Sequence, residues 1–240
     1  MTCDLAVVLD KFEDVIEFAV ENNEPFGYFA VIHHAATSAV NNNLGAFEDV
    51  ERIHRFIELF AGRYLAAVGA YLTKTQAHRG RELPGWAGVF DHDLTVMESV
   101  QLGINAHVVW DLGFILAEIG QTPQGLAAFR RDFAVFYDLA LPVFPRAWGA
   151  LDEIVPRVRW MRRAMTPGFW PWLFNHFRDR SWRFAEQLLA RPENKAKLCE
   201  RQLAYTHTIE RRWRKILPLF AAGESRDTAA NILRLKEAMR

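Results

Sequence analysis

GINAHVVWDLG, residues 103–113, lies in the middle of the longest apolar stretch of the chain and sets polar side chains among residues suited to burial. The stretch belongs to an apolar segment over about residues 93–119 with helical periodicity. Glu98, Asp111 and Glu118 interrupt this segment, so we expect the core helix of a bundle rather than a membrane span.

A helical wheel at about 100° per residue divides the polar side chains of this helix into two sets. His107, Asp111 and Glu118 fall on one face, and Gly103 opens space one turn before the histidine. Asn105 falls on the opposite side. The wheel therefore predicts a site at His107 and Asp111, and a bracing role for Asn105.

A histidine and an aspartate four residues apart on one helix can share a proton or a divalent cation. His107 would be a general acid/base or a metal ligand, and Asp111 would orient it or join it as a ligand. Two ligands do not make a metal site, and we consider His34 or His176 to complete it. The structural alternative is a buried His–Asp pair that bonds to neighbouring helices.

The rest of the chain also has helical periodicity, and no run of alternating β-branched residues indicates a sheet. The sequence therefore predicts an all-α, single-domain bundle of about eight or nine helices over residues 1–240, with residues 191–240 as a candidate C-terminal helical extension. The break at 156–171 is the only candidate boundary. Helices are expected over about residues 4–22, 26–40, 49–75, 93–119, 124–140, 150–165, 173–190, 193–221 and 226–239.

Composition narrows the class of protein. Half of the 240 residues are apolar and 13% are aromatic, enough for a substantial core. Cys3 and Cys199 are the only cysteines, which excludes a disulfide framework. The N-terminus is acidic and has no secretory signal pattern, so we expect a cytoplasmic protein without a membrane partner.

Charge is distributed unevenly although the net charge is zero. Residues 1–155 hold 10 Lys/Arg and 21 Asp/Glu, whereas residues 156–240 hold 19 and 8. The simplest interpretation is that the basic section packs against the acidic one. The alternative is a basic face for an anionic partner.

Two further segments carry candidate binding residues. His34 lies on a narrow stripe of small and polar residues where a ligand could approach, whereas His33 is expected to be a packed core side chain. Farther on, Arg178 and Trp182 are four residues apart on one face, suited to stacking or cation–π contact. We therefore add His34, Gly103, Arg178 and Trp182 as substrate-binding candidates.

Basic residues interleaved with aromatic ones also occur in proteins that bind nucleic acid. Here they recur at helical spacing, and the acidic N-terminal section offers an internal partner, so we expect no nucleic-acid partner. Gly-rich phosphate loops, nucleophile elbows and paired Glu-x-x-His motifs are absent from the sequence.

The segment GINAHVVWDL resembles the Asn-Ala-His-x-x-x-Asp-Leu signature of a family of uncharacterised proteins, a domain of unknown function. Thr37 resembles a threonine of that family's early helix, FAGRY (Phe60, Ala61, Tyr64) its Phe-Ala-x-x-Tyr helix, and RDRSW (Arg178, Asp179, Trp182) its Arg-acid-x-small-Trp segment. The resemblance spans roughly residues 26–190. It implies an all-α fold and a shared site at Asn105, His107 and Asp111. The family tends to have a tyrosine near His33, so no role is carried over to His33 or His34.

Three functional hypotheses follow. The first is an enzyme that acts on a small, partly apolar molecule through His107 and Asp111, by acid/base catalysis or by metal-assisted hydrolysis. The second is a non-catalytic binding protein for an apolar ligand or a haem-like cofactor. The third is a scaffold whose basic C-terminal helices dock on an acidic partner. A homo-oligomer is compatible with each.

Overall fold

The computed structural model describes residues 5–73, 84–159 and 168–240. Every regular element within these ranges is helical and none is a strand, so the predicted all-α multi-helix fold is confirmed. The principal elements are α1 (Leu5–Asn22), α2 (Gly27–Asn41), α3 (Val50–Thr73), α4 (Val96–Ile104), the π-helix η2 (Asn105–Asp111), α5 (Leu112–Gly120), α6 (Pro123–Ala140), α7 (Val143–Ile154), α9 (Phe169–Ala190), α10 (Lys195–Ile216) and α11 (Thr228–Met239). Short 3₁₀ turns lie at Leu44–Ala46, Pro192–Asn194 and Leu217–Phe220.

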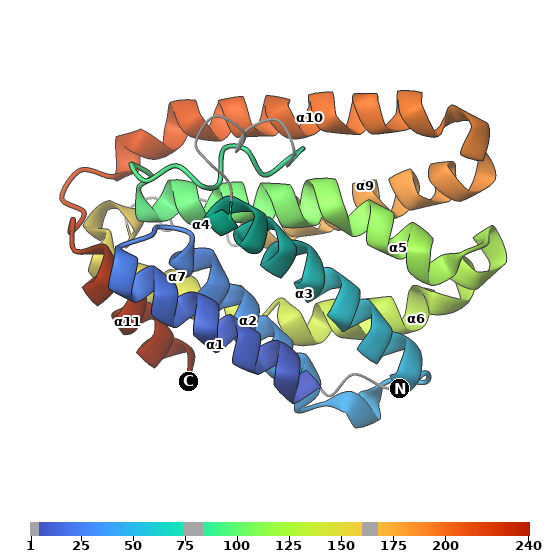
Figure 1. Ribbon diagram of the computed structural model, residues 1–240, viewed down its shortest axis with the longest axis horizontal. Coiled ribbons are helices and arrows are strands. Elements are labelled where there is room, and N and C mark those ends of the chain that lie inside the picture. The colour runs from blue at the N-terminus through green and yellow to red at the C-terminus, as the bar shows by residue number, and fades with distance from the viewer. Residues whose placement is uncertain (1–4, 74–83, 160–167) are drawn as a thin grey trace.

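One helix, made of α4, η2 and α5 in continuous succession, runs through the middle of the bundle (Figure 1). The helices α2, α3, α9 and α10 pack around it. Its span, Val96–Gly120, is long and apolar enough to cross a membrane by length and composition, but 83% of its apolar window is buried inside the protein. That burial is what the core helix of a bundle requires.

Local sequence sets both ends of this central helix. At its start, the Thr95 hydroxyl accepts a hydrogen bond from the Glu98 N–H, and the Glu98 carboxylate accepts one from the Thr95 N–H. This capping box satisfies donors that the first helical turn leaves open. At its end, Gln121 adopts a left-handed φ of 58°, and Thr122 then caps α6 ahead of Pro123.

Two glycines let neighbouring helices approach the central helix closely. A Cβ on Gly103 would come within 2.5 Å of the Phe29 ring on α2. A Cβ on Gly113 would come within 2.5 Å of the Phe184 ring and 3.0 Å of the Ser181 carbonyl oxygen on α9. These two contacts fix α2 and α9 against opposite ends of the π segment.

Most predicted helices begin and end within a few residues of the observed ones. The exception is the helix expected at 150–165. The structure has α7 over Val143–Ile154, a break at Val155, and helix again over 156–159. Pro145 is accommodated because it lies in the first turn of α7, where backbone N–H groups have no helical acceptor. Most of the candidate boundary at 156–171 lies outside the described residues.

The C-terminal helix α11 shares the core of the N-terminal helices. It packs against α1, α2 and α7, and Ile232 and Leu235 are fully buried. Gly27 on α2 makes room for this contact, since a Cβ there would collide with the Ile232 side chain. Lys236 forms an ion pair with Glu13 on α1.

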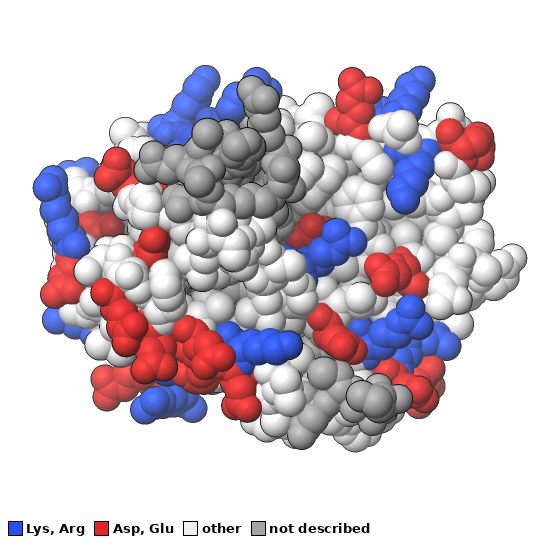
Figure 2. Space-filling model, viewed as in Figure 1, with Lys and Arg blue, Asp and Glu red and all other residues white. Residues whose placement is uncertain are grey.

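The uneven charge of the sequence is visible on the surface (Figure 2). Acidic side chains gather at the lower left, over α1, which carries Asp10, Asp14 and Glu17 on its exposed face. In the described part of the chain, the ion pairs that join the basic section to the acidic one are Lys236–Glu13 and Arg214–Asp91. Among the residues that the structure describes, many arginines of α9 and α10 therefore have no acidic partner from the N-terminal section.

Candidate functional site

The centre of the candidate site is the π-helical segment Asn105–Asp111. Leu112 donates its backbone N–H to the carbonyl of His107, five residues back instead of four. Side chains from two other helices bond to carbonyls of this segment. The Ser181 hydroxyl on α9 donates to the Val108 carbonyl at 2.6 Å, and the Gln202 amide on α10 donates to the Val109 carbonyl.

His107 lies inside an aromatic enclosure and is 1% exposed. The ring of Phe60 on α3 stacks on its imidazole with the centroids 3.7 Å apart, and the ring of Phe29 meets it edge-on. These contacts fix the ring plane. The Nε2 atom of His107 consequently faces Nε2 of His33 on α2, at 2.6 Å.

The histidine pair is the middle of a longer chain of polar groups. His33 Nδ1 lies 3.2 Å from the Thr37 hydroxyl, one helical turn along α2. On the other side, His107 Nδ1 lies 3.8 Å from Asp111 Oδ2 and has no hydrogen-bond partner in the described part of the chain. The Trp86 indole N–H donates to that same Oδ2 at 2.8 Å. The chain thus runs from Thr37 through His33 and His107 to Asp111.

Donor and acceptor roles can be assigned consistently along this chain. The Trp86 indole N–H can only donate, so Asp111 accepts from it. With Asp111 ionised, His107 carries its proton on Nδ1 and accepts at Nε2 from His33, whose Nδ1 then accepts from Thr37. If Thr37, His33 and His107 each pass their proton to the next group, Asp111 gains a proton and both imidazoles stay neutral.

Burial shifts the pKa values of these groups in the directions that such a proton transfer requires. It lowers the pKa of His107 to about 3. Burial, followed by the neighbouring His107, holds the pKa of His33 well below its usual value. Burial raises the pKa of Asp111 to about 7, although the Trp86 hydrogen bond and the charge of Arg63 lower it. Asp111 is therefore the group of the chain suited to hold a proton near neutral pH.

An apolar pocket of about 60 Å³ adjoins this series of polar side chains, and His33, His107 and Thr37 all line it. The other lining side chains are almost entirely aliphatic and aromatic, among them Ile57, Phe60, Leu112, Tyr137 and Phe144. This volume holds a few water molecules or a small organic fragment. Chemistry here would act on a molecule that is small and mostly apolar.

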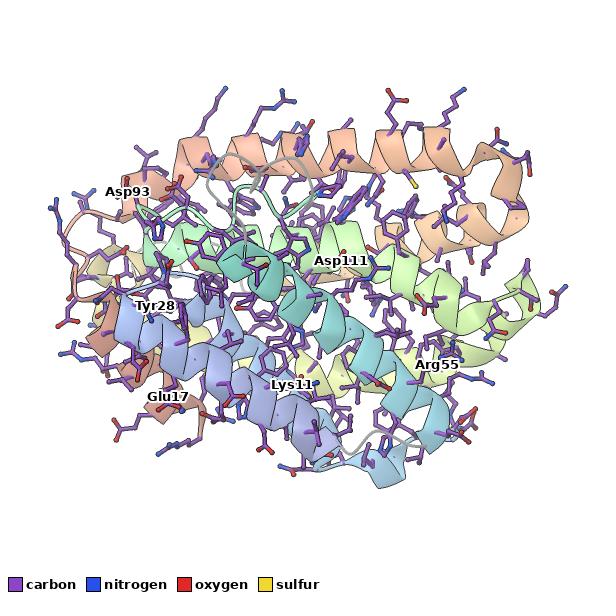
Figure 3. The ribbon with its side chains drawn as sticks, viewed as in Figure 1. Lys11, Glu17, Tyr28, Arg55, Asp93 and Asp111 are labelled. Atoms are coloured by element: carbon purple, nitrogen blue, oxygen red, sulfur yellow. The ribbon has the colours of Figure 1, made fainter. Side chains whose placement is uncertain are left out.

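A larger hollow, of about 880 Å³, lies away from the histidines along α1 and α3 and beside the α5–α6 turn. Figure 3 labels Lys11 and Arg55, which line it, and Asp111 on the central helix. Charged residues of both signs line this hollow, including the exposed Glu118. Glu118 does not join His107 and Asp111 as the helical wheel suggested, because the π segment turns less per residue than the α-helix that the wheel assumes.

The other histidines predicted for the site have partners elsewhere. His34 Nε2 lies 3.5 Å from Glu13, in a half-exposed pair on α1 and α2. His176 stacks on the Trp172 ring and lies 3.3 Å from the Tyr205 hydroxyl. Neither contacts His107 or Asp111.

The remaining predicted binding residues also lie outside the pocket lining. Gly103 is covered by the Phe29 ring. The Arg178 guanidinium pairs with Asp179 and sits 5.1 Å from the centre of the Tyr137 ring, which lines the pocket. Trp182 is buried and donates to Glu186, with the Arg130 guanidinium over its ring.

A metal centre is not assembled in the part of the chain that the structure describes. Across these ranges, no group of three or more His, Cys, Asp and Glu side chains is arranged to hold a metal ion. The ligands predicted from the sequence are dispersed, because His34 pairs with Glu13 and His176 lies beside Tyr205, away from His107 and Asp111. His107 and Asp111 remain adjacent, with His33 as their neighbour.

Sequence reasoning missed His33, Thr37 and Trp86 as members of the polar chain. His33 is indeed packed in the core, as expected, but its ring nitrogens face His107 and Thr37. A signal was available: Thr37 and Phe60 are landmarks of the family resemblance, and both contact the histidine pair. Asn105 turns away from the pair and donates to the Thr206 carbonyl on α10, consistent with the predicted brace.

Comparison with known proteins gives a family and no described activity. Searches among curated proteins and among solved structures found no match. A family model described as "Family of unknown function (DUF5995)" matches residues 5–217, a range that contains the whole polar chain from Thr37 to Asp111. This protein therefore belongs to the DUF5995 family.

Proposed function

We propose that the protein is an enzyme that hydrolyses a small, mostly apolar ester by general acid/base catalysis in the histidine-lined pocket. The observation that carries this proposal is the 2.6 Å contact between His33 Nε2 and His107 Nε2 beside an apolar pocket. A buried His–His contact of this kind costs desolvation of four ring nitrogens, and a simple core would not need it.

In the proposed reaction, a water molecule in the pocket bonds to the Thr37 hydroxyl. Its proton passes to Thr37 Oγ1 while the Thr37 proton moves to His33 Nδ1, and the transfer continues through His107 to Asp111 Oδ2. The resulting hydroxide attacks the ester carbonyl carbon, and the proton returns along the chain to the leaving alkoxide. The His107–Asp111 distance of 3.8 Å must shorten in the complex, as catalytic hydrogen bonds often do on binding.

Hydrolysis of methyl formate and methyl acetate, esters small enough for the pocket, tests this proposal by titration of the acid released. We expect His107→Asn and Asp111→Asn to lower kcat/KM by about 10²- to 10⁴-fold, the usual contribution of a general acid/base. The control is His207→Asn, which changes an exposed histidine on α10 and should leave the rate unchanged. Absence of hydrolysis by the wild-type protein, or full activity in His107→Asn, would refute the proposal.

The second candidate is a non-catalytic binding protein for a small apolar ligand. The nearly complete apolar lining of the pocket favours it. A haem-like cofactor is less well matched, because the 60 Å³ pocket is far below the roughly 300–1,000 Å³ of sites for larger ligands. Saturable binding of a small ketone such as acetone, with no ester turnover, would favour this candidate, and visible absorbance of the purified protein would favour a chromophore.

A further inference from the structure

A second pocket, of about 120 Å³, lies between α9 and α10, away from the histidine pair. Three arginines and two side-chain amides line it together with two apolar residues: Arg180, Arg183 and Gln187 from α9, and Arg201 and Gln202 from α10. The two helices run antiparallel, joined by the short turn Pro192–Asn194, which holds the arginines of both helices near one another.

The pocket has three positive charges in its wall and no carboxylate. Carboxylates nearby on α9 are engaged elsewhere: Asp179 pairs with Arg178, and Glu186 accepts from the Trp182 indole. Within the described part of the chain, neither Arg180, Arg183 nor Arg201 forms an ion pair. Three guanidinium groups that stay charged at any physiological pH thus face one small volume without a counter-charge.

Arg180 is held in place despite this repulsion. Its guanidinium carbon lies 3.5 Å from the centre of the Tyr205 ring, a cation–π contact that fixes the planar group. Its Nε atom is buried and has no hydrogen-bond partner in the described residues. Burial lowers the pKa of Arg180, Tyr205 raises it, and the like charges of Arg183 and Arg201 lower it further.

From the three arginines that form no ion pair among the described residues, the Gln187 amide and the small volume, we infer that this pocket binds a phosphate-class oxyanion. Guanidinium groups bond to tetrahedral oxyanions with two parallel N–H donors, and the exposed amide of Gln187 adds a neutral donor. A volume of 120 Å³ accommodates the oxyanion itself but not a nucleoside. The ligand is therefore free phosphate or the phosphate group of a monoester whose remainder lies in solvent. This inference is independent of the proposed hydrolytic function.

Isothermal titration calorimetry at constant ionic strength tests the inference, with inorganic phosphate and glycerol phosphate as separate titrants and chloride as the reference anion. The test variants are Arg183→Gln and Arg201→Gln, both at exposed positions where folding should be preserved. The matched control is Arg212→Gln, an exposed arginine of α10 outside the pocket. Circular dichroism and the unfolding midpoint confirm that each variant is folded.

We expect saturable phosphate binding by the wild-type protein, at least tenfold weaker binding in each test variant, and unchanged binding in Arg212→Gln. Tighter binding of glycerol phosphate than of inorganic phosphate would identify a monoester as the ligand, and the reverse order would identify free phosphate. Equal binding by the wild type and both test variants, or a phosphate response no greater than that to chloride, would overturn the inference.

Discussion

The contact between His33 Nε2 and His107 Nε2 carries a hydrogen bond only while one of the two facing nitrogens lacks a proton. Burial keeps both rings neutral, with the pKa of His107 lowered to about 3 and that of His33 lowered well below 6.5. The unfolded chain takes up protons at both rings below pH 6.5, and the folded protein does not. This contribution to stability is therefore fully present above pH 6.5 and is lost as the pH falls from there towards 3.

His107→Asn removes one of these two groups. The wild type should lose stability faster than this variant as the pH falls from 7 to 5. We therefore expect the difference between their free energies of unfolding to decrease, by up to about 1.4 kcal/mol per pH unit. Urea denaturation at pH 7, 6 and 5 measures it. The exposed His207→Asn variant should show a constant difference from the wild type. Parallel stability curves for wild type and His107→Asn would contradict the neutral pair.

Asp111 should show the opposite pH dependence. Its pKa is raised from 3.8 to about 7 in the folded protein, so the folded state holds a proton that the unfolded state has lost between those values. Its contribution to stability is present below pH 3.8 and is lost as the pH rises through 7. Asp111→Asn stays neutral and can still accept from Trp86. We expect its stability relative to the wild type to rise between pH 5 and pH 8, measured by urea denaturation. A relative stability that stays constant or falls would argue against a raised pKa.

The sequence predicted one half of the polar chain and missed the other for a physical reason. His107 and Asp111 are four residues apart on one helix, so their proximity follows from local geometry alone. His33 reaches His107 from 74 residues away, and that contact depends on how α2 is rotated against the central helix. A single helical wheel contains no information on this rotation. Trp86 lies between the helices expected over residues 49–75 and 93–119, where no periodicity indicates which way a side chain points.

At the scale of elements, the π segment depends on side chains from two other helices. The Ser181 hydroxyl and the Gln202 amide donate to the carbonyls of Val108 and Val109. We expect Ser181→Ala and Gln202→Ala each to lower the free energy of unfolding by about 1–3 kcal/mol, because each leaves a buried carbonyl short of a donor. Urea denaturation measures the loss.

The control for this prediction is Thr208→Ala, which removes an exposed hydroxyl that bonds to the Ala204 carbonyl of its own helix. Its effect should stay within about 0.5 kcal/mol. If Ser181→Ala and Gln202→Ala lower the free energy of unfolding no more than this control, the π segment is stable without its neighbours.

The π segment also accounts for the position of Glu118. A helical wheel with a constant angle per residue set Glu118 on the face of His107, whereas Glu118 lies at the surface beside the larger hollow.

At the scale of the whole molecule, the core joins the two ends of the chain. The central helix contacts α2 and α3 from the N-terminal section and α9 and α10 from the C-terminal one, so the polar chain at its middle is enclosed by both. The all-α fold followed from periodicity because helices form from local sequence. The packing of α11 on α1 and α2 did not follow, because residues over 200 positions apart meet there.

Ile232 tests whether that packing stabilises the whole fold. It is fully buried on α11 against Gly27 of α2, and it belongs to the same apolar core as the N-terminal helices. We expect Ile232→Ala to lower the free energy of unfolding by about 2–5 kcal/mol and Ile232→Val by about 0.5–1.5 kcal/mol. Leu233→Ala, at a half-exposed neighbour, is the control and should have little effect.

Because the whole core should unfold together, tryptophan fluorescence and circular dichroism should give one coincident transition in Ile232→Val. If that variant showed a separate early transition and the rest of the protein were unaffected, α11 would fold apart from the core. Its contact with α1 and α2 would then contribute nothing to the enclosure of the histidine pair.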